Sequence, residues 1–230
     1  MKNVLFSFLK GILAGLAIGL GGFFYILMVH YVDGELGKVL GSALFAIGLF
    51  LVCTFQLSLY TGKIGNVYEG EQEAWFYVSL PVMLIGNAIG AISLGYLCYA
   101  IFNTTEIMYT VDSICYSRLV FNADNDFQLF KDCLSCIIKS FLCGTCVYLA
   151  VKCFNLNRLK PLGISLLVLF VFIFVYCGFQ HCIANMFYFG FGDTYRNVYT
   201  YLNLGLVILF NSAGPIAGVG LVKAVTNRAY

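Results

Sequence analysis

Charged residues are scarce in this sequence. Only 10% of its 230 residues are Asp, Glu, Lys or Arg, whereas 61% are hydrophobic. That balance excludes an ordinary soluble domain and indicates a protein that lies within a lipid bilayer. The formal net charge of +2 is also too small to indicate a nucleic-acid-binding protein. We therefore expect a membrane protein with no nucleic-acid partner.

The sequence also lacks the residue sets that bind metals and redox cofactors. Histidine occurs only twice, and His30 falls in a polar turn. A haem-containing redox enzyme of the membrane would need paired histidines or a closed set of cysteines. Ten cysteines are present, but most lie in apolar stretches, where cysteine behaves as a small hydrophobe. The spacings Cys133–Cys136 and Cys143–Cys146 lie in one segment and lack a second pair of ligands. We expect no enzyme activity, no cofactor and no metal site.

The apolar residues form stretches that can cross a bilayer as helices. The first resembles the apolar part of a signal peptide, but it is too long and lacks a cleavage region of small residues. The chain is therefore predicted to be an all-α integral membrane protein with a single domain over residues 1–230. The six stretches cover about residues 8–29, 38–63, 75–102, 136–154, 162–191 and 199–222.

The basic residues predict the orientation of the chain. With both termini in the cytoplasm, eight Lys and Arg side chains fall on the cytoplasmic side and four on the outer side, in agreement with the positive-inside rule. The protein is therefore predicted to be a multi-pass protein of the cell (cytoplasmic) membrane. The cytoplasmic set is Lys2, Lys10, Lys63, Lys152, Arg158, Lys160, Lys223 and Arg228, and the outer set is Lys38, Arg118, Lys131 and Arg196.

A weak internal repeat divides the chain into two halves, at about residues 8–102 and 136–222. Three spans in each half require that the halves have opposite topology. In transporters with inverted repeats, broken helices place the substrate site near the middle of the membrane. We therefore predict that the second and fifth helices are broken, near Thr61 and His181. The matching segments are Lys10–Gly15 with Lys139–Gly144, and Gly86–Ala91 with Gly214–Val219.

The segment Gly178–Met186 places an ionisable side chain, His181, within an apolar stretch. Gly178 and Asn185 flank this histidine and tolerate non-helical backbone. An ionisable residue at membrane depth is costly and usually faces a cavity or a partner. The alternative is a core histidine that forms a hydrogen bond between two helices. The position favours a functional site at His181.

Motifs along nearly the whole chain resemble those of the formate/nitrite transporter family of anion channels. The resemblance implies an aquaporin-like bundle of six transmembrane helices, assembled as a homopentamer with one pore in each subunit. Asn87 and Asn185 lie within these motifs and are expected to have structural roles. The motifs are the central-histidine segment Gly178–Met186, the third-helix segment Gly86–Ala91, and Leu59–Gly62 at the loop that breaks the second helix.

The chain departs from the family pattern in ways that leave the substrate open. Ser58 stands where an acidic residue is usual, and Gln56 stands where a glycine is usual. The fourth-helix motif, usually Asn-x-x-Val-Cys-Leu-Ala, reads Gly-Thr-Cys-Val-Tyr-Leu-Ala at Gly144–Ala150. Pro215 occupies the position at which the sixth helix usually has an asparagine.

The resemblance also implies roles for individual residues. Thr61 and His181 form the central polar pair. Lys10 and Lys139 occupy equivalent places in the two halves of the internal repeat, and from this we expect one lysine at each mouth to attract anions. Each group has an alternative interpretation. Aromatic residues at helical spacing often only pack in the core, and lysines near the ends of spans often only extend to the membrane interface. The constrictions implied by the family are Phe45, Leu49, Leu59, Tyr60 and Phe174.

The expected function is a passive or proton-linked channel for small monovalent anions of weak acids. Hydrosulfide is the first expectation, because the family's hydrosulfide-conducting branch suits so short and divergent a member. Formate or nitrite is the alternative. His181 is expected to donate a hydrogen bond or lend a proton to the anion, which then crosses partly as its neutral acid. A neutral-solute channel of aquaporin type is a further hypothesis, but it should carry two Asn-Pro-Ala motifs, and the sequence has none.

Overall fold

The computed structural model describes residues 2–69, 72–119, 126–156 and 160–226. Within these ranges the chain is helical and contains no strand. Five of the described helices are long and apolar enough to cross a membrane. The prediction of an all-α membrane protein is therefore confirmed.

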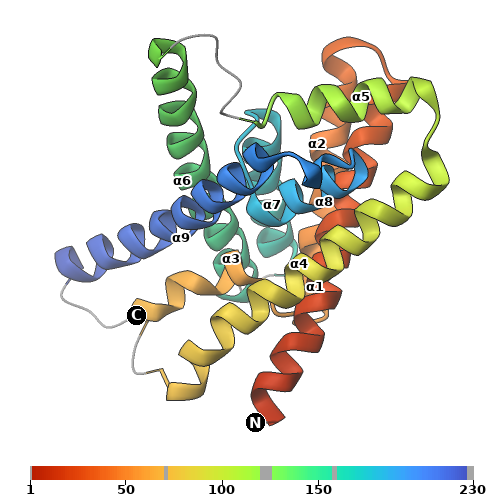
Figure 1. Cartoon of the computed structure of the whole chain (residues 1–230). Helices are drawn as coiled ribbons and strands as arrows, with labels where there is room; N and C mark the ends of the chain where they lie inside the picture. Colours follow the sequence, from red (N-terminus) through yellow and green to blue (C-terminus); the bar gives the residue numbers. More distant parts are fainter. Residues whose placement is uncertain (1, 70–71, 120–125, 157–159, 227–230) are drawn as a thin grey trace.

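The long helices pack in two groups (Figure 1). α1 (Lys2–Tyr31) contacts both α2 (Gly34–Thr54) and α4 (Ala74–Phe102) along much of its length. α6 (Asp126–Leu156) contacts α9 (Val198–Thr226) in a similar way.

Shorter helices fill the space between these groups. The predicted span at residues 162–191 is divided into α7 (Lys160–Tyr176) and α8 (Cys182–Phe191). α7 lies against α2 and α6, and α8 lies against α4. The remaining elements are α3 (Tyr60–Lys63), η1 (Ile64–Tyr68), α5 (Thr105–Tyr116) and η2 (Thr194–Arg196).

The region between α4 and α6 contains a further helix, α5. One local prediction differs from the structure. His30, predicted in a turn, lies in the last turn of α1, and its Nδ1 is 3.1 Å from Oγ1 of Thr110 on α5. A polar partner on α5 therefore allows α1 to continue past the end of its apolar stretch.

Glycines bring the long helices into close contact. A Cβ atom on Gly15 would overlap the backbone carbonyl of Asn87, and one on Gly144 would overlap that of Asn211. In lipid, small residues let helix backbones approach closely, and van der Waals packing then holds them together. The two contacts place Asn87 and Asn211 in the interior of the bundle.

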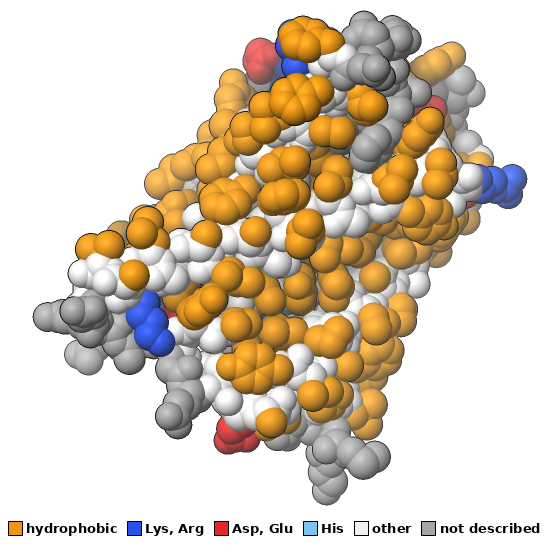
Figure 2. Space-filling view, turned by 60° about the vertical axis from the view of Figure 1, so that its left-hand side comes forward, with side chains coloured by type: hydrophobic (Ala, Val, Ile, Leu, Met, Phe, Trp, Pro, Cys, Tyr) orange, Lys and Arg blue, Asp and Glu red, His pale blue; other side chains and the backbone are white. Residues whose placement is uncertain are grey.

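The exterior is largely apolar. Leu13, Ile85, Leu97 and Leu209 each have more than half of their surface exposed. Figure 2 shows a face covered mostly by hydrophobic side chains, with charged side chains near its edges. Exposed apolar surface of this extent suits contact with lipid or with another protein.

Candidate functional site

Two interruptions of the helices bring the predicted polar pair together. One interruption separates α2 from α3, and the other separates α7 from α8. Oγ1 of Thr61, in α3, lies 2.9 Å from Nε2 of His181, which directly precedes α8. Both side chains are buried. Two residues 120 positions apart in the sequence therefore form one buried polar contact.

Each interruption begins with the same type of helix end. Gln56 (φ 50°) and Gly178 (φ 67°) have left-handed backbone, and each lies two residues after the last residue of a helix. The next residue in each case, Leu57 or Phe179, donates its N–H to a carbonyl five residues earlier. Such ends usually carry glycine, because a side chain is strained at positive φ. This conformation explains why the family pattern has a glycine at position 56. Gln56 adopts it here at a cost in backbone strain.

Asn87 of α4 holds the first interruption in place. Its Oδ1 accepts a hydrogen bond from the backbone N–H of Tyr60 at 2.9 Å. Its Nδ2 donates to the carbonyl oxygens of Ser58 and Gly11, both at 2.8 Å. Asn87 is fully buried. Its amide therefore satisfies the Tyr60 N–H and the Ser58 carbonyl, which have no partner within a helix, and ties them to α1 through Gly11.

Asn211 of α9 holds the second interruption in a matching way. Its Oδ1 accepts from the backbone N–H of Cys182 at 2.8 Å. Its Nδ2 donates to the carbonyl oxygens of Gln180 at 2.8 Å and Ser140 at 2.7 Å. The two sets match. Asn87 bonds the two neighbours of Leu59, and Asn211 bonds the two neighbours of His181. Each asparagine also bonds a carbonyl oxygen on a neighbouring long helix.

Asn211 was not predicted as a site residue. The internal repeat pairs Gly86–Ala91 with Gly214–Val219, and the family pattern expects an asparagine at the position of Pro215. The hydrogen bonds instead pair Asn87 with Asn211, four residues before Pro215. The chain therefore has an asparagine that holds the second interruption, although Pro215 stands where the family pattern places one.

Hydrogen bonds fix the orientation of the imidazole. The backbone N–H of Ala184 donates to Nδ1 of His181 at 3.3 Å. In a neutral ring Nε2 then carries the proton and donates it to Oγ1 of Thr61. The Thr61 hydroxyl proton is left for a further acceptor. The pair can thus present a hydroxyl donor to an anion beside it.

Two aromatic rings pack beside the polar pair. The ring centroids of Phe45 and Phe174 are 5.8 Å apart at an interplanar angle of 84°. The Phe174 ring is 6.0 Å from the imidazole of His181. Both phenylalanines are buried, and the edge-to-face arrangement is a favoured packing of aromatic rings. The structure therefore brings two of the predicted constriction residues next to the predicted centre.

The other predicted constriction residues have different surroundings. Leu49 is buried in the same apolar core as Phe45. The Tyr60 hydroxyl lies 2.9 Å from Oγ of Ser212 on α9, and its ring packs in a separate apolar cluster. Leu59 is buried and lines a cavity. Tyr60 is thus anchored to α9, while Leu59 borders open space.

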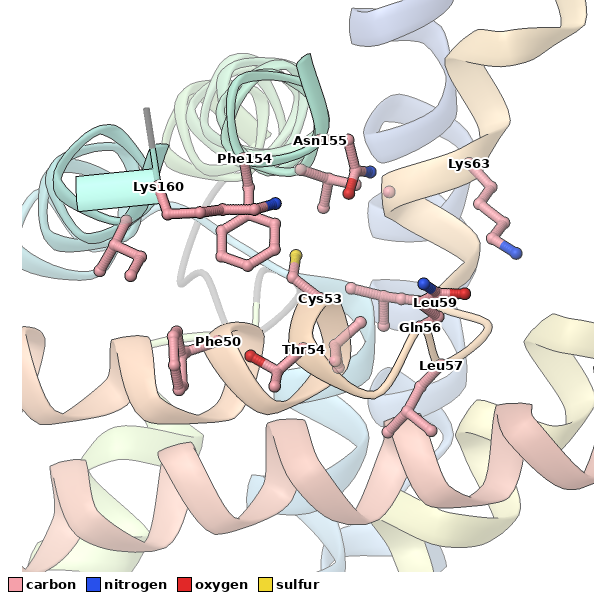
Figure 3. A pocket seen from close by; sticks show the side chains of 14 residues that line it. Phe50, Cys53, Thr54, Gln56, Leu57, Leu59, Lys63, Phe154, Asn155 and Lys160 are labelled. Atoms are coloured by element: carbon pink, nitrogen blue, oxygen red, sulfur yellow. The ribbon is translucent and has the colours of Figure 1, made fainter. Parts of the chain in front are cut away.

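The cavity beside Leu59 has a volume of about 600 Å³ (Figure 3). Lys63 and Lys160 belong to its lining, and its described lining contains no acidic side chain. Nζ of Lys160 lies 5.2 Å from the ring centroid of Phe154, and Figure 3 shows this side chain extended over the ring. Lys63 follows Thr61 by only two positions, but it was predicted only as a basic residue of the cytoplasmic side and not as a site residue. The cavity has a positive lining that suits anions.

The two predicted anion-attracting lysines differ in their placement. Lys139 is half-buried and lines a smaller hollow of about 230 Å³, together with Gln180, the neighbour of His181. Lys10 is exposed on α1 and lines neither this hollow nor the cavity beside Leu59. Its carbonyl oxygen accepts a hydrogen bond from the Ser58 N–H at 3.4 Å, at the first interruption.

Asn185 joins a polar cluster behind the second interruption. Its Oδ1 accepts a hydrogen bond from Nη1 of Arg118 at 2.8 Å. Its Nδ2 donates to Oε1 of Gln180 at 2.8 Å and to Oδ1 of Asn203 at 3.3 Å. Sequence analysis placed Arg118 among the outer basic residues but gave it no role in the site, because its loop is distant from this segment in sequence.

The described residues include no cluster of three or more His, Cys, Asp or Glu side chains that could hold a metal ion. His181 is engaged by Thr61 and Ala184. The chemistry that this arrangement can offer is hydrogen-bond donation and positive charge.

Comparisons with known proteins agree with one another. Residues 2–225 match the protein family described as Formate/nitrite transporter. Among solved structures, one described as a pentameric formate channel with formate bound matches with a TM-score of 0.79 and 23% identity, covering 98% of each chain. Another, described as an FNT family ion channel, matches with a TM-score of 0.77 and 20% identity, covering 98% of this chain and 91% of the other. A search of curated proteins finds no match. At these identities the solved structures show a shared fold.

Proposed function

The chain belongs to the formate/nitrite transporter family, and on this basis we propose that it is a passive or proton-linked channel for small monovalent anions of weak acids. Hydrosulfide is the proposed substrate, because its conjugate acid titrates near neutrality and is easily formed. Formate or nitrite is the second candidate, favoured by the family match and by the fold shared with a formate channel. The observation that carries the proposal is the buried Thr61–His181 contact between two helix interruptions.

The proposed architecture has six membrane spans in two inverted repeats, at about residues 8–102 and 136–222. α2 with α3 forms the broken second span, and α7 with α8 forms the broken fifth. The matching hydrogen bonds of Asn87 and Asn211 support this arrangement. We also propose a homopentamer in the cytoplasmic membrane with both termini inside the cell. The cavity of Lys63 and Lys160 then faces the cytoplasm, and the hollow of Lys139 faces outward.

The site reduces the cost of moving an anion out of water. An ion that leaves water for an apolar medium loses several kcal/mol of solvation or more. The Thr61 hydroxyl can donate to the anion, and the α8 N-terminus beside His181 adds the positive end of a helix dipole. A weak-acid anion that accepts a proton avoids most of the charge penalty. Phe45 and Phe174 exclude hydrated ions, as apolar constrictions do in other channels.

The constrictions predict a change in size selectivity. Leu59→Ala or Phe174→Ala should widen the passage, so that acetate and propionate cross as well as formate. The measurement is uptake of a series of carboxylates of increasing size into proteoliposomes. Leu209→Ala, on an exposed leucine, serves as the control. If neither variant changes the size limit, these side chains do not form the constriction.

Lys139 predicts a salt-dependent effect. Lys139→Met should lower anion flux most at low ionic strength, because the attraction of a partly exposed charge is screened over about 10 Å at 0.1 M salt. Flux is measured in 10 mM and in 300 mM salt, with Lys131→Met, on an exposed lysine, as the control. A loss of the same size at both salt concentrations would mean that Lys139 acts through folding or direct binding.

The proposed substrate is tested by anion selectivity. Purified protein in proteoliposomes should carry hydrosulfide, formate and nitrite and exclude chloride, the anion of a strong acid. A faster flux of hydrosulfide than of formate supports the first candidate, and the reverse order supports the second. A chloride flux equal to that of the weak-acid anions would reject the proposed mechanism.

A further inference from the structure

Arg118 carries a charge that no described acidic side chain neutralises. It follows α5, and its guanidinium carbon lies 4.5 Å from the ring centroid of Tyr188. Nη1 donates to Asn185, whereas Nε is buried without a hydrogen-bond partner in the described part of the molecule. Neither of the ion pairs formed by the described residues includes Arg118. A partly buried guanidinium of this kind keeps its full positive charge.

Hydrogen bonds connect Arg118 to the central pair. Its carbonyl oxygen accepts from Nδ2 of Asn203 at 2.6 Å and from Nε2 of Gln180 at 3.3 Å. The Asn185 side chain bonds both Arg118 and Gln180, and the Asn185 backbone N–H donates to the His181 carbonyl at 2.8 Å. Arg118 is therefore held behind the second interruption, within one connected network that ends at His181.

The hollow lined by Lys139 and Gln180 lies beside this network, and its lining does not balance the charge of Arg118. Ser117, directly before Arg118, lines it together with Gln180. The charged residues of the lining, Asp132 and Lys139, have opposite signs and add no net charge. The field of Arg118 is thus left unmatched by the lining, and a hollow near an excess of one sign of charge attracts counter-ions.

We propose that Arg118 determines the charge selectivity of the channel. Its fixed positive charge stabilises an anion in the hollow and at the Thr61–His181 pair, and it disfavours cations. This inference rests on the proposed channel function and names a further residue that serves it. Arginine stays protonated at any physiological pH, so the effect requires no titration. Because the guanidinium is held in a buried network, salt screens it less than an exposed charge.

The test compares variants that keep or remove the charge. Arg118→Gln should lower formate flux into proteoliposomes by about tenfold, the lower end of the effect of focused fields on charged ligands. In a sodium formate gradient across a planar bilayer it should also move the reversal potential toward that of sodium. Both effects should persist at high salt. Arg118→Lys should keep flux within about threefold of the wild type, since it retains the charge. Arg196→Gln, on an exposed arginine, is the matched control and should change neither quantity.

The proposal is overturned if Arg118→Gln conducts like the wild type, or if Arg118→Lys loses as much flux as Arg118→Gln. The second result would assign the effect to the contact with Asn185. If Arg118→Gln does not assemble, variants of Ser117 provide the test, because this residue is exposed and lines the hollow. Ser117→Asp should lower formate flux more than the isosteric Ser117→Asn does, because only aspartate adds a negative charge, and equal flux in the two overturns the proposal. A wild type that carries none of the test anions would instead refute the proposed function.

Discussion

Replacing Asn211 with alanine is expected to prevent stable assembly. The change removes hydrogen bonds from three buried backbone groups, at Ser140, Gln180 and Cys182. Ser140 lies inside α6, so its carbonyl keeps its place in the helix, whereas the Gln180 carbonyl and the Cys182 N–H have no partner within a helix. Each buried polar group left without a partner costs about 1–3 kcal/mol, so these two groups together cost about 2–6 kcal/mol. A loss of this size is a large part of the stability of a typical domain, about 5–15 kcal/mol. The measurement is thermal unfolding of the detergent-solubilised protein, with its assembly followed by size-exclusion chromatography.

Two further variants make this result specific. Asn87→Ala should destabilise the protein by a similar amount, because Asn87 forms the matching set of bonds. Asn155→Ala is the control, since this asparagine is exposed and its replacement should change stability by less than about 0.5 kcal/mol. If Asn211→Ala is as stable as Asn155→Ala, the asparagines do not hold the two interruptions.

Replacing His181 with asparagine is expected to preserve the assembled protein and to reduce its flux. Asparagine is shorter than histidine, so its amide does not hold the Thr61 hydroxyl toward the anion as the imidazole does. A hydrogen bond to a charged group contributes about 1.5–3 kcal/mol, and its loss lowers the flux by about ten- to a hundredfold. Asparagine also cannot titrate between pH 5 and 8 as histidine ordinarily does. Any step of the wild-type flux in that pH range should therefore vanish. The measurement is formate flux against pH, because formate itself titrates well below this range.

The other histidine provides the control. His30 lies at the end of α1, with Thr110 as its partner, and His30→Asn should leave the flux–pH curve unchanged. If His181→Asn assembles and its flux–pH curve coincides with that of the wild type, His181 is a core residue that links two helices and not a donor to the anion.

The predictions from sequence were correct where they depended on short, contiguous stretches of the chain. The apolar stretches predicted the membrane helices, and the family motifs predicted a membership that the family comparison confirms. The segments around Thr61 and His181 were recognisable because each places polar or glycine residues inside an apolar stretch. The pairing of the two residues was implied by the family resemblance, and the internal repeat indicated only that the chain is interrupted near each of them. Their roles in conduction stay predictions.

Other parts of the site have no local signal. Asn211 is a single asparagine in a long apolar helix, and only the fold shows that it reaches Gln180 and Cys182. Arg118 lies in a polar loop that looks like ordinary membrane-flanking sequence, and its contact with Asn185 joins residues 67 positions apart. The separate packing of Tyr60 follows from the position of α9, which sequence spacing cannot give.

The central claim is that this chain conducts anions, and uptake of labelled formate tests it most directly. Purified wild-type protein is placed in proteoliposomes at pH 7, and protein-free liposomes are the reference. Entry of glycerol is measured in both preparations by the swelling that a glycerol gradient causes. We expect formate to enter much faster than in protein-free liposomes, while glycerol enters at the protein-free rate. Rapid glycerol-driven swelling without uptake of formate, nitrite or hydrosulfide would contradict the account and would identify a neutral-solute channel.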